Sequence, residues 1–447
     1  MSMSFIIACE SGKRKIAELL LANGEVEVGY TDEKGRTALH YAAHRGYLDL
    51  VQLLIAAGAD LNYEDHAGET PLYFACLQKQ KQTALYLLSQ DAKAEIKDLK
   101  GNGLLHLTAQ SGQIEVLEKL LEKGLEVDSE NNEAETPLLI AASWRNKEIV
   151  KLLLNHGANI NTTNKNGDSP LLFAVASKNL PVTELLLENG ASINHVNHNG
   201  VSALLQACYD SNRMLIKLLM DKGADVFASS KNGQSPIWYA CSNNQKEIVS
   251  LFLENGVDVN YSKPASGDEA SMYSYLDWVE TATNLSASSS FSLDTDYGYG
   301  GESLLHVAAK SGNSSMVKLL LDKAANINIQ DESGNTALHY AAANGKKDIV
   351  KMLLEQQADG NVVNAKEQKA IDYANIKGFN EITALLLQFN PSAQASFSKP
   401  EEPAADEKPK PDLASKKQAL LDLKELLDMG ILSQAEFDVE KGKILSS

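Results

Sequence analysis

Apolar residues recur along the chain in two kinds of short segment that alternate. The first kind has the form Thr/Ser-x-Leu-x-x-Ala, and the second is a stripe of branched apolar residues such as residues 149–154. A polar break that often holds glycine separates the two kinds, and a Gly-containing turn precedes each pair. This pattern predicts two short helices after each turn, with the apolar residues of both helices buried.

The first kind of segment begins at intervals of 33 residues. Its ten occurrences begin at Thr37, Thr70, Gly103, Thr136, Ser169, Ser202, Ser235, Ser303, Thr336 and Lys369. The one irregular step, from Ser235 to Ser303, covers 68 residues, which is about two periods. A fixed period of this length indicates a repeat architecture, in which one unit cannot bury its leucines without neighbours on both sides.

Several positions of the repeat have a local physical role. The opening Thr or Ser can cap the first helix with its hydroxyl group, and a proline at the next position, as in residues 136–137, suits a first helical turn. Paired small residues such as Ala141 and Ala142 let the first helix approach its neighbour closely. The motif Gly-Ala-Asp/Asn-x-Asn, at residues 58–62 and 157–161, ends the second helix and turns the chain.

These motifs resemble the ankyrin repeat over residues 1 to about 390. The resemblance implies an all-α fold, an ankyrin-repeat solenoid whose units are a β-turn finger and a helix pair, with the turns and first helices on a concave face. It also implies a structural role for the histidines at the signature position, whose rings hydrogen-bond between neighbouring turns. These histidines are His40, His106, His306 and His339.

The repeats and their interruptions divide the chain into five parts. Residues 1–264 hold about eight repeats, the first of them a cap, and residues 301–390 hold about three, the last of them a cap. Residues 265–300 share only Ser274–Val279 with the signature and have no second leucine stripe, so we expect a degenerate repeat with a Ser-rich loop. Residues 391–412 are rich in proline and predict a flexible linker.

The fifth part, residues 413–447, predicts a small C-terminal helical hairpin. Four leucines form a helical stripe, Gly430 breaks it, and residues 433–436 form a capping box for a second helix. The segment resembles the short C-terminal (SHOCT) domain of many bacterial proteins, which implies oligomerisation or docking and a bacterial source. So small a hairpin exposes apolar residues unless something covers them. The candidate oligomerisation residues are Leu423, Leu427, Ile431, Leu432 and Phe437.

The balance of charges narrows the class of partner. The chain has 41 Lys and Arg residues against 59 Asp and Glu residues, which gives a formal net charge of −18. Nucleic acid and anionic membranes require clustered positive charge, so we expect neither as a partner and favour a neutral or basic protein. No run of apolar residues is long enough for membrane insertion. All four cysteines follow an alanine within the repeat, as packing residues do, and a reducing cytoplasm fits them best.

Motifs for catalysis and metal binding are missing from the sequence. It contains no Walker loop, no His-Glu-x-x-His, no nucleophile elbow and no Cys-x-x-Cys pair, so we expect no catalytic residues, no metal and no cofactor. Residues 294–298 begin like a calcium loop but lack the glycine and glutamate that such a loop requires further on. His195 and His198 lie in a polar turn, where two nitrogens cannot complete a zinc shell.

Two aromatic residues stand where the repeat leaves side chains exposed. Trp144 and Tyr209 follow the small residues of their first helices, at positions that other units fill with small or polar residues. Aromatic residues of this kind often anchor protein interfaces, so we predict that both belong to a protein-binding face, the alternative being a local packing role. The charged residues that we assign to the same face are Arg145, Asp210, Arg213 and Lys165.

These observations favour a non-enzymatic, cytoplasmic adaptor or scaffold. Its repeats would hold one protein, the linker would give reach, and the C-terminal hairpin would gather copies of the chain or dock on a second protein. Two alternatives stay open. One is a bacterial effector that is secreted into a host cell and acts on host proteins, because repeats of a eukaryotic kind precede a tail of a bacterial kind. The other is a regulator or inhibitor of a partner enzyme.

Overall fold

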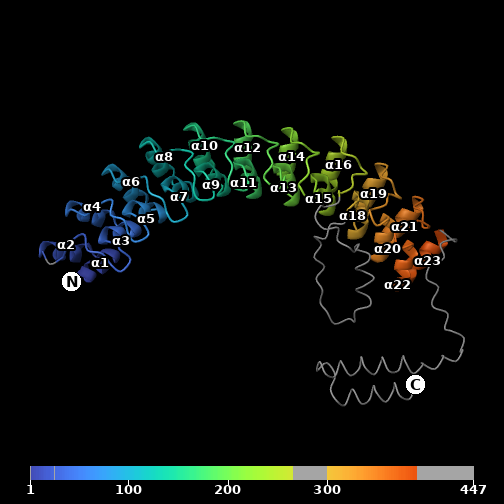
Figure 1. Ribbon diagram of the computed structural model, residues 1–447, viewed down its shortest axis with the longest axis horizontal. Coiled ribbons are helices and arrows are strands. Elements are labelled where there is room, and N and C mark those ends of the chain that lie inside the picture. Colours follow the sequence, from blue (N-terminus) through green and yellow to red (C-terminus); the bar gives the residue numbers. More distant parts are fainter. Residues whose placement is uncertain (1, 25, 265–299, 390–447) are drawn as a thin grey trace, which may run out of the picture. The chain divides into compact units, whose positions relative to one another are not determined.

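The computed structural model describes residues 2–24, 26–264 and 300–389, which hold 22 helices and no β-strand. The helices alternate between two layers, so that each unit contributes one helix to each layer (Figure 1). The all-α fold predicted from the sequence is confirmed.

The first helices of the units form one layer. They are α1 (Ser2–Glu10), α3 (Ala38–Arg45), α5 (Pro71–Leu77), α7 (Leu104–Ser111), α9 (Pro137–Ser143), α11 (Pro170–Ala176), α13 (Ala203–Tyr209), α15 (Pro236–Ser242), α18 (Leu304–Ser311), α20 (Ala337–Ala343) and α22 (Ala370–Ile376).

The second helices form the other layer. They are α2 (Arg14–Ala22), α4 (Leu48–Ala56), α6 (Lys81–Ser89), α8 (Ile114–Glu122), α10 (Lys147–Asn155), α12 (Leu180–Glu188), α14 (Arg213–Asp221), α16 (Lys246–Glu254), α19 (Ser314–Asp322), α21 (Lys347–Glu355) and α23 (Asn380–Phe389). Within the first layer every helix packs against the next one in the row, and most neighbouring pairs of second helices pack in the same way.

The predicted caps hold the start of the first helices. In α9, the Thr136 hydroxyl accepts a hydrogen bond from the Leu139 amide at 3.4 Å, and proline occupies the next position. The Ser202 hydroxyl accepts in the same way from the Leu205 amide at 3.1 Å. Each cap satisfies an amide that the helix itself leaves unbonded, so the short first helices begin at defined residues.

The core runs between the two layers as one continuous apolar cluster. Ala42 and Ala43 of α3 are fully buried, as are Leu50 and Leu54 of α4, and the same positions are buried in each unit from α5 to α21 that the structure describes. The small residues bring neighbouring first helices close together, and the leucines fill the space between the layers. Each unit therefore depends on its neighbours for burial, as the repeat pattern predicts.

The finger that precedes α18 closes across a long gap in the sequence. The Lys263 amide donates to the Glu302 carbonyl at 3.0 Å, and the Gly301 amide donates to the Lys263 carbonyl at 2.8 Å. Residues 331–335 of the next finger make the same pair of bonds within five consecutive residues. Because α15 also packs directly against α18, the unit that begins at Ser303 stacks directly on the unit that begins at Ser235.

Several predictions fall outside the described residues. They concern residues 265–299 of the expected degenerate repeat, the linker at 391–412 and the hairpin at 413–447 with its candidate oligomerisation residues. The division of the chain into five parts therefore stays a prediction.

Candidate functional site

The two predicted contact aromatics lie at the C-terminal ends of first helices and are well exposed. Trp144 directly follows α9 with 55% of its surface exposed, and Tyr209 ends α13 with 61% exposed. One complete unit, α11 with α12, lies between theirs, so the two side chains are separated by about 20 Å of stacked helices. The structure thus places them on the same layer without bringing them into contact.

Tyr209 belongs to an aromatic cluster that the sequence did not reveal. Its ring meets the ring of Tyr239 edge to face, with centroids 5.4 Å apart and planes at 84°. Tyr239 meets Trp238 in the same manner at 5.5 Å, and the Lys263 ammonium lies 5.4 Å from the centre of the Trp238 ring. We call Tyr209, Tyr239 and Trp238 the aromatic cluster. Trp238 occupies the signature position, which most other units fill with histidine or leucine, and this departure was the signal in the sequence that could have revealed the cluster.

Two of the charged candidates are held by the units beside them. The Arg145 guanidinium donates to the Ser177 carbonyl of the following unit. Asp210 lies 3.7 Å from the Lys178 ammonium and accepts a hydrogen bond from the Gln206 amide at 2.7 Å. These contacts hold the charged residues that directly follow Trp144 and Tyr209 in the chain.

The other two charged candidates lie further from the aromatics. Arg213 begins α14, in the second-helix layer, where its guanidinium pairs with Glu247 at 2.9 Å. Lys165 lies in the finger before α11, 3.9 Å from Glu133 of the preceding finger. That finger meets the N-terminal end of α11, whereas Trp144 and Tyr209 lie at C-terminal helix ends. The six predicted residues therefore do not form one compact site.

The signature histidines link each finger to the next. In His40, Nδ1 accepts the Thr37 amide at 3.1 Å and Nε2 lies 3.1 Å from the Glu69 carbonyl of the following finger. An Nδ1 that accepts carries no proton, so Nε2 is the donor of a neutral ring. His106 and His339 repeat this geometry. In His306, Nδ1 accepts the Ser303 amide in the same way, but Nε2 lies 3.0 Å from the Ile329 carbonyl, which precedes the next finger.

Burial keeps these rings uncharged at neutral pH. It lowers the pKa of His40 and His106 and takes the pKa of His306 and His339 down to about 4. The His195 ring also joins two fingers, with Nε2 placed 2.7 Å from the Gly167 carbonyl. The histidines of the repeat are thus engaged in structural hydrogen bonds.

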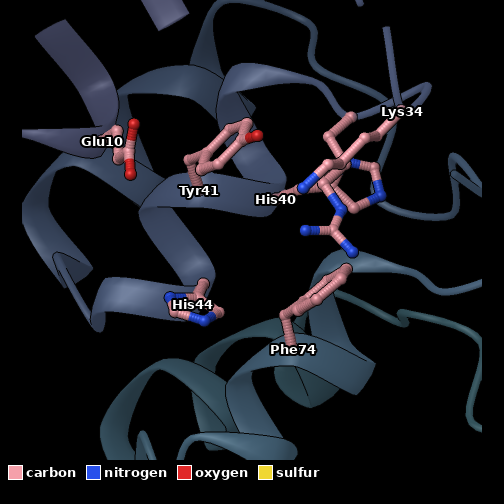
Figure 2. Close-up of a pocket in the computed structure, with 7 residues that line it drawn as sticks. Glu10, Lys34, His40, Tyr41, His44 and Phe74 are labelled. Carbon is pink, nitrogen blue, oxygen red and sulfur yellow. The ribbon is translucent and has the colours of Figure 1, made fainter. Parts of the chain in front are cut away.

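A cavity of about 280 Å³ lies among the first units and was not expected from the sequence. Figure 2 shows its lining, to which three separate units contribute: Glu10, Lys34, Arg36, His40, Tyr41, His44 and Phe74. The Arg36 guanidinium lies 4.5 Å from the centre of the Phe74 ring and is bonded to Asp65 at 2.9 Å. A space of this size can accept one side chain of a partner protein. No sequence motif reports such a cavity, because its residues meet only when units stack.

The four cysteines offer no reactive thiolate. All four are buried and unbridged. Burial raises the pKa of the Cys9, Cys76 and Cys241 thiols to about 12 and also raises the pKa of Cys208. Their sulfur atoms are therefore protonated at neutral pH, and they pack as small apolar groups.

Two further findings concern the described residues as a whole. Residues 2–24, 26–264 and 300–389 contain no set of three or more His, Cys, Asp or Glu side chains arranged to hold a metal ion. Among the same residues, none of the helices combines the length and the apolar character that crossing a membrane requires.

Comparison with known proteins gives one family. A family model described as ankyrin repeats (3 copies) matches residues 5–98, 105–197, 189–263, 271–365 and 305–397. No curated protein matches the chain.

Proposed function

The chain belongs to the ankyrin-repeat family, whose repeats generally mediate protein–protein interaction, and on this premise we propose that it is an adaptor or scaffold that binds a protein partner on its first-helix layer. Ankyrin-repeat proteins are generally non-enzymatic, and the proposal includes no catalytic step.

The aromatic cluster is the observation that carries this proposal. Tyr209 is largely exposed, yet its ring already rests against Tyr239 in a favourable edge-to-face arrangement. A large side chain that is ordered before binding loses little conformational entropy when a partner covers it. Exposed, ordered aromatic residues are therefore suited to anchor an interface.

Charge supports a neutral or basic partner. The chain carries a formal net charge of −18, which attracts cationic surfaces and repels anionic ones. Asp210, next to Tyr209, is partly neutralised by Lys178, so the immediate surroundings of the aromatic cluster are less acidic than the chain as a whole. We therefore propose that apolar contact anchors the partner and that overall charge speeds its approach.

The C-terminal hairpin supplies a second part of the proposal, argued from sequence alone. Its apolar residues, among them Leu423, Leu427 and Phe437, would promote oligomerisation or docking on a second protein. A cytoplasmic location follows the same reasoning, since the four buried thiols suit a reducing compartment.

The test is affinity capture from a native lysate with mass spectrometry, using the full chain and three variants. We expect Tyr209→Ala to lose a specific protein and Trp144→Ala to lose it in part. Phe227→Ala is the matched control, because Phe227 is 65% exposed but lies after α14, outside the first-helix layer.

The outcome is read from the differences between variants. A protein retained by Phe227→Ala and lost by Tyr209→Ala supports the aromatic cluster as its site. Equal capture by all four forms would refute this placement of the contacts. Thermal unfolding of each variant, followed by circular dichroism, separates lost contact from lost folding.

A further inference from the structure

The last residue of each finger, directly before the capping residue of the first helix, changes its chemistry along the chain. In the finger before α3 this residue is Arg36. In every later repeat that carries the signature, from Glu69 to Gln368, the position holds Glu, Asp, Asn, Gln or Val. A cation at a position that the other repeats leave acidic or uncharged indicates a local role for Arg36, separate from the stacking that all units share.

The unit that contains α18 shows how an acidic residue is used at this position. The Glu302 carboxylate pairs with the Lys310 ammonium at 3.1 Å, and only 3% of the Glu302 side chain is exposed. The same ammonium lies 5.8 Å from the centre of the Tyr340 ring, in the following unit. We call Glu302, Lys310 and Tyr340 the ion-pair group. In it a carboxylate is held by a cation that also faces an aromatic ring.

The equivalent residues near the N-terminus line the cavity that Figure 2 shows. By position in the repeat, Arg36 corresponds to Glu302 and His44 corresponds to Lys310. Phe74 corresponds to the aromatic ring of the ion-pair group, and its ring centre lies 4.5 Å from the Arg36 guanidinium. Arginine and histidine cannot supply the acid of an ion pair, and a cavity of about 280 Å³ lies among these side chains. The cavity thus has the cation and the ring of the ion-pair group without the carboxylate between them.

Three lining residues have N–H groups that can bind a carboxylate. Arg36 donates from Nε to Asp65 at 2.9 Å and from Nη2 to Glu69 at 3.4 Å, and within the described part of the chain its Nη1 has no acceptor. Lys34 is exposed and forms no ion pair with the residues that the structure describes. Burial lowers the pKa of His44, so its ring is neutral at pH 7 and carries one N–H.

The acidic groups around the cavity already have partners of their own. Glu10, in the lining, pairs with Arg45 at 3.2 Å, and Asp65 and Glu69 are bonded to Arg36. These carboxylates leave the cations of the cavity available, yet their charge disfavours a ligand with more than one negative charge. A carboxylate, with a single charge, therefore suits the cavity better than a phosphate group, which carries nearly two.

We propose that the cavity receives one Asp or Glu side chain of the protein partner, whose carboxylate binds Arg36, Lys34 and His44. The inference rests on the proposed adaptor function and adds to it a second contact, away from the aromatic cluster. One acidic side chain is compatible with a partner that is neutral or basic as a whole. The cavity would then fix which residue of the partner lies against the first units, because a buried charge is rejected where no partner meets it.

The test is a selection of short random peptides, displayed on phage, against the full chain. We expect the enriched peptides to share an Asp or Glu at one position. Replacing that residue by Asn or Gln in a synthetic copy should weaken binding to the unchanged chain at least about tenfold, since the charge-assisted hydrogen bonds are lost. Fluorescence anisotropy of the labelled peptides gives the two dissociation constants.

Two variants assign the preference for the acidic peptide to the cavity. Arg36→Gln introduces the residue that the chain itself has at Gln234, and Lys34→Gln removes an exposed charge. Each should lose most of the preference for the acidic peptide over its amide form. Lys100→Gln is the matched control, because Lys100 has the place of Lys34 in another finger, where Asn102 stands instead of arginine. Circular dichroism shows whether each variant keeps its fold.

The possible results separate this inference from the proposed function. A preference for the acidic peptide that persists in both Arg36→Gln and Lys34→Gln would overturn the inference, and so would a selection without a shared acidic residue. Tighter binding of a phosphoserine peptide than of the Glu peptide would overturn the choice of a carboxylate. Five steps of the stack, about 40–50 Å, separate α3 from α13. Capture of a protein that depends on Tyr209 would therefore still support the adaptor function if the cavity binds no peptide.

Discussion

The central and C-terminal units fill the same signature position with opposite chemistry. Leu139, Leu172 and Leu205 occupy it in the central units and are almost completely buried among apolar neighbours. His306 and His339 occupy it in the C-terminal units, where both ring nitrogens are hydrogen-bonded. The same position of the repeat can therefore hold either a buried leucine or a buried histidine whose two ring nitrogens are hydrogen-bonded. We call the hydrogen bonds of this histidine the polar link.

The polar link of the C-terminal units extends into a buried network. The Tyr340 hydroxyl donates to Asp331 at 2.7 Å, and the Asn364 amide donates to Asn335 at 3.0 Å and to the Tyr373 hydroxyl at 2.8 Å. Buried polar groups contribute only while all of them stay bonded. We infer that the stability of the C-terminal units depends on protonation state, whereas that of the central units depends chiefly on apolar area.

Lowering the pH should produce the largest difference in stability between the C-terminal units and the central units. His306 and His339 have a pKa of about 4 when folded, below the usual value of 6.5. Between these pH values the unfolded chain binds protons that the folded chain does not. The free energy of unfolding therefore falls as the pH drops from 6.5 towards 4, and the contribution of the two neutral rings is fully present above pH 6.5. The slope is about 1.4 kcal/mol per pH unit for each histidine. Hydrogen exchange at pH 7 and pH 5 should show loss of protection in α18–α22 and little in α9–α13; equal losses would contradict the comparison.

Removing one ring should weaken the C-terminal units somewhat less. His339→Ala leaves the Thr336 amide and the Gln368 carbonyl without their partner and opens a cavity, at a cost of about 3 kcal/mol. His339→Leu copies the central units, restores apolar volume and should recover part of that loss. Urea unfolding, followed by amide hydrogen exchange in α20 and α22, measures the stability of both variants. An unchanged stability in His339→Ala would show that the polar link does not stabilise these units.

A smaller effect is expected from a cap of the central units. Ser202→Ala deletes the hydroxyl that accepts the Leu205 amide and should cost about 1 kcal/mol. In the C-terminal unit, the backbone amide of the cap residue Thr336 donates to the His339 ring, so this ring also helps to fix the residue at which the helix begins. The Thr336 hydroxyl also lies 2.9 Å from the same ring nitrogen, so Thr336→Ala should cost more than Ser202→Ala in the same denaturation assay, and the reverse order would count against this reasoning.

The smallest effect is expected at an exposed ion pair. Arg213 and Glu247 join two second helices at 2.9 Å, with half or more of each side chain in solvent. Such pairs contribute about 0–1 kcal/mol and weaken with salt. The thermal midpoint of Arg213→Ala should lie close to that of the unchanged chain, and any difference should vanish at 1 M salt. A large loss of stability would show that Arg213 has a further structural role.

Much of the fold could be read from the sequence because its signals are local and repeated. Thr136 and Ser202 cap their helices as predicted, and the glycine turns and leucine stripes mark the same boundaries in unit after unit. The exposure of Trp144 and Tyr209 also followed from position within the repeat.

The surroundings of the candidate site could not be read in the same way. Tyr239 and Trp238 come from the unit after Tyr209, and the cavity at Phe74 draws on three units. Arg145 and Asp210 find their partners in neighbouring units, and Arg213 finds its partner in the next second helix. These contacts depend on how side chains meet across units, for which the sequence period carries no information.

By itself the sequence determined the unit: its length, its helix pair, its caps and the apolar positions that each unit must bury. It did so because hydrogen bonding and apolar spacing within 33 residues fix these features. Only the tertiary structure decided what stacking leaves uncovered, as at Phe227, and what it brings together, as at the aromatic cluster. The reason is physical, since exposure and contact are properties of a residue's neighbours, and in a stack most neighbours belong to other units.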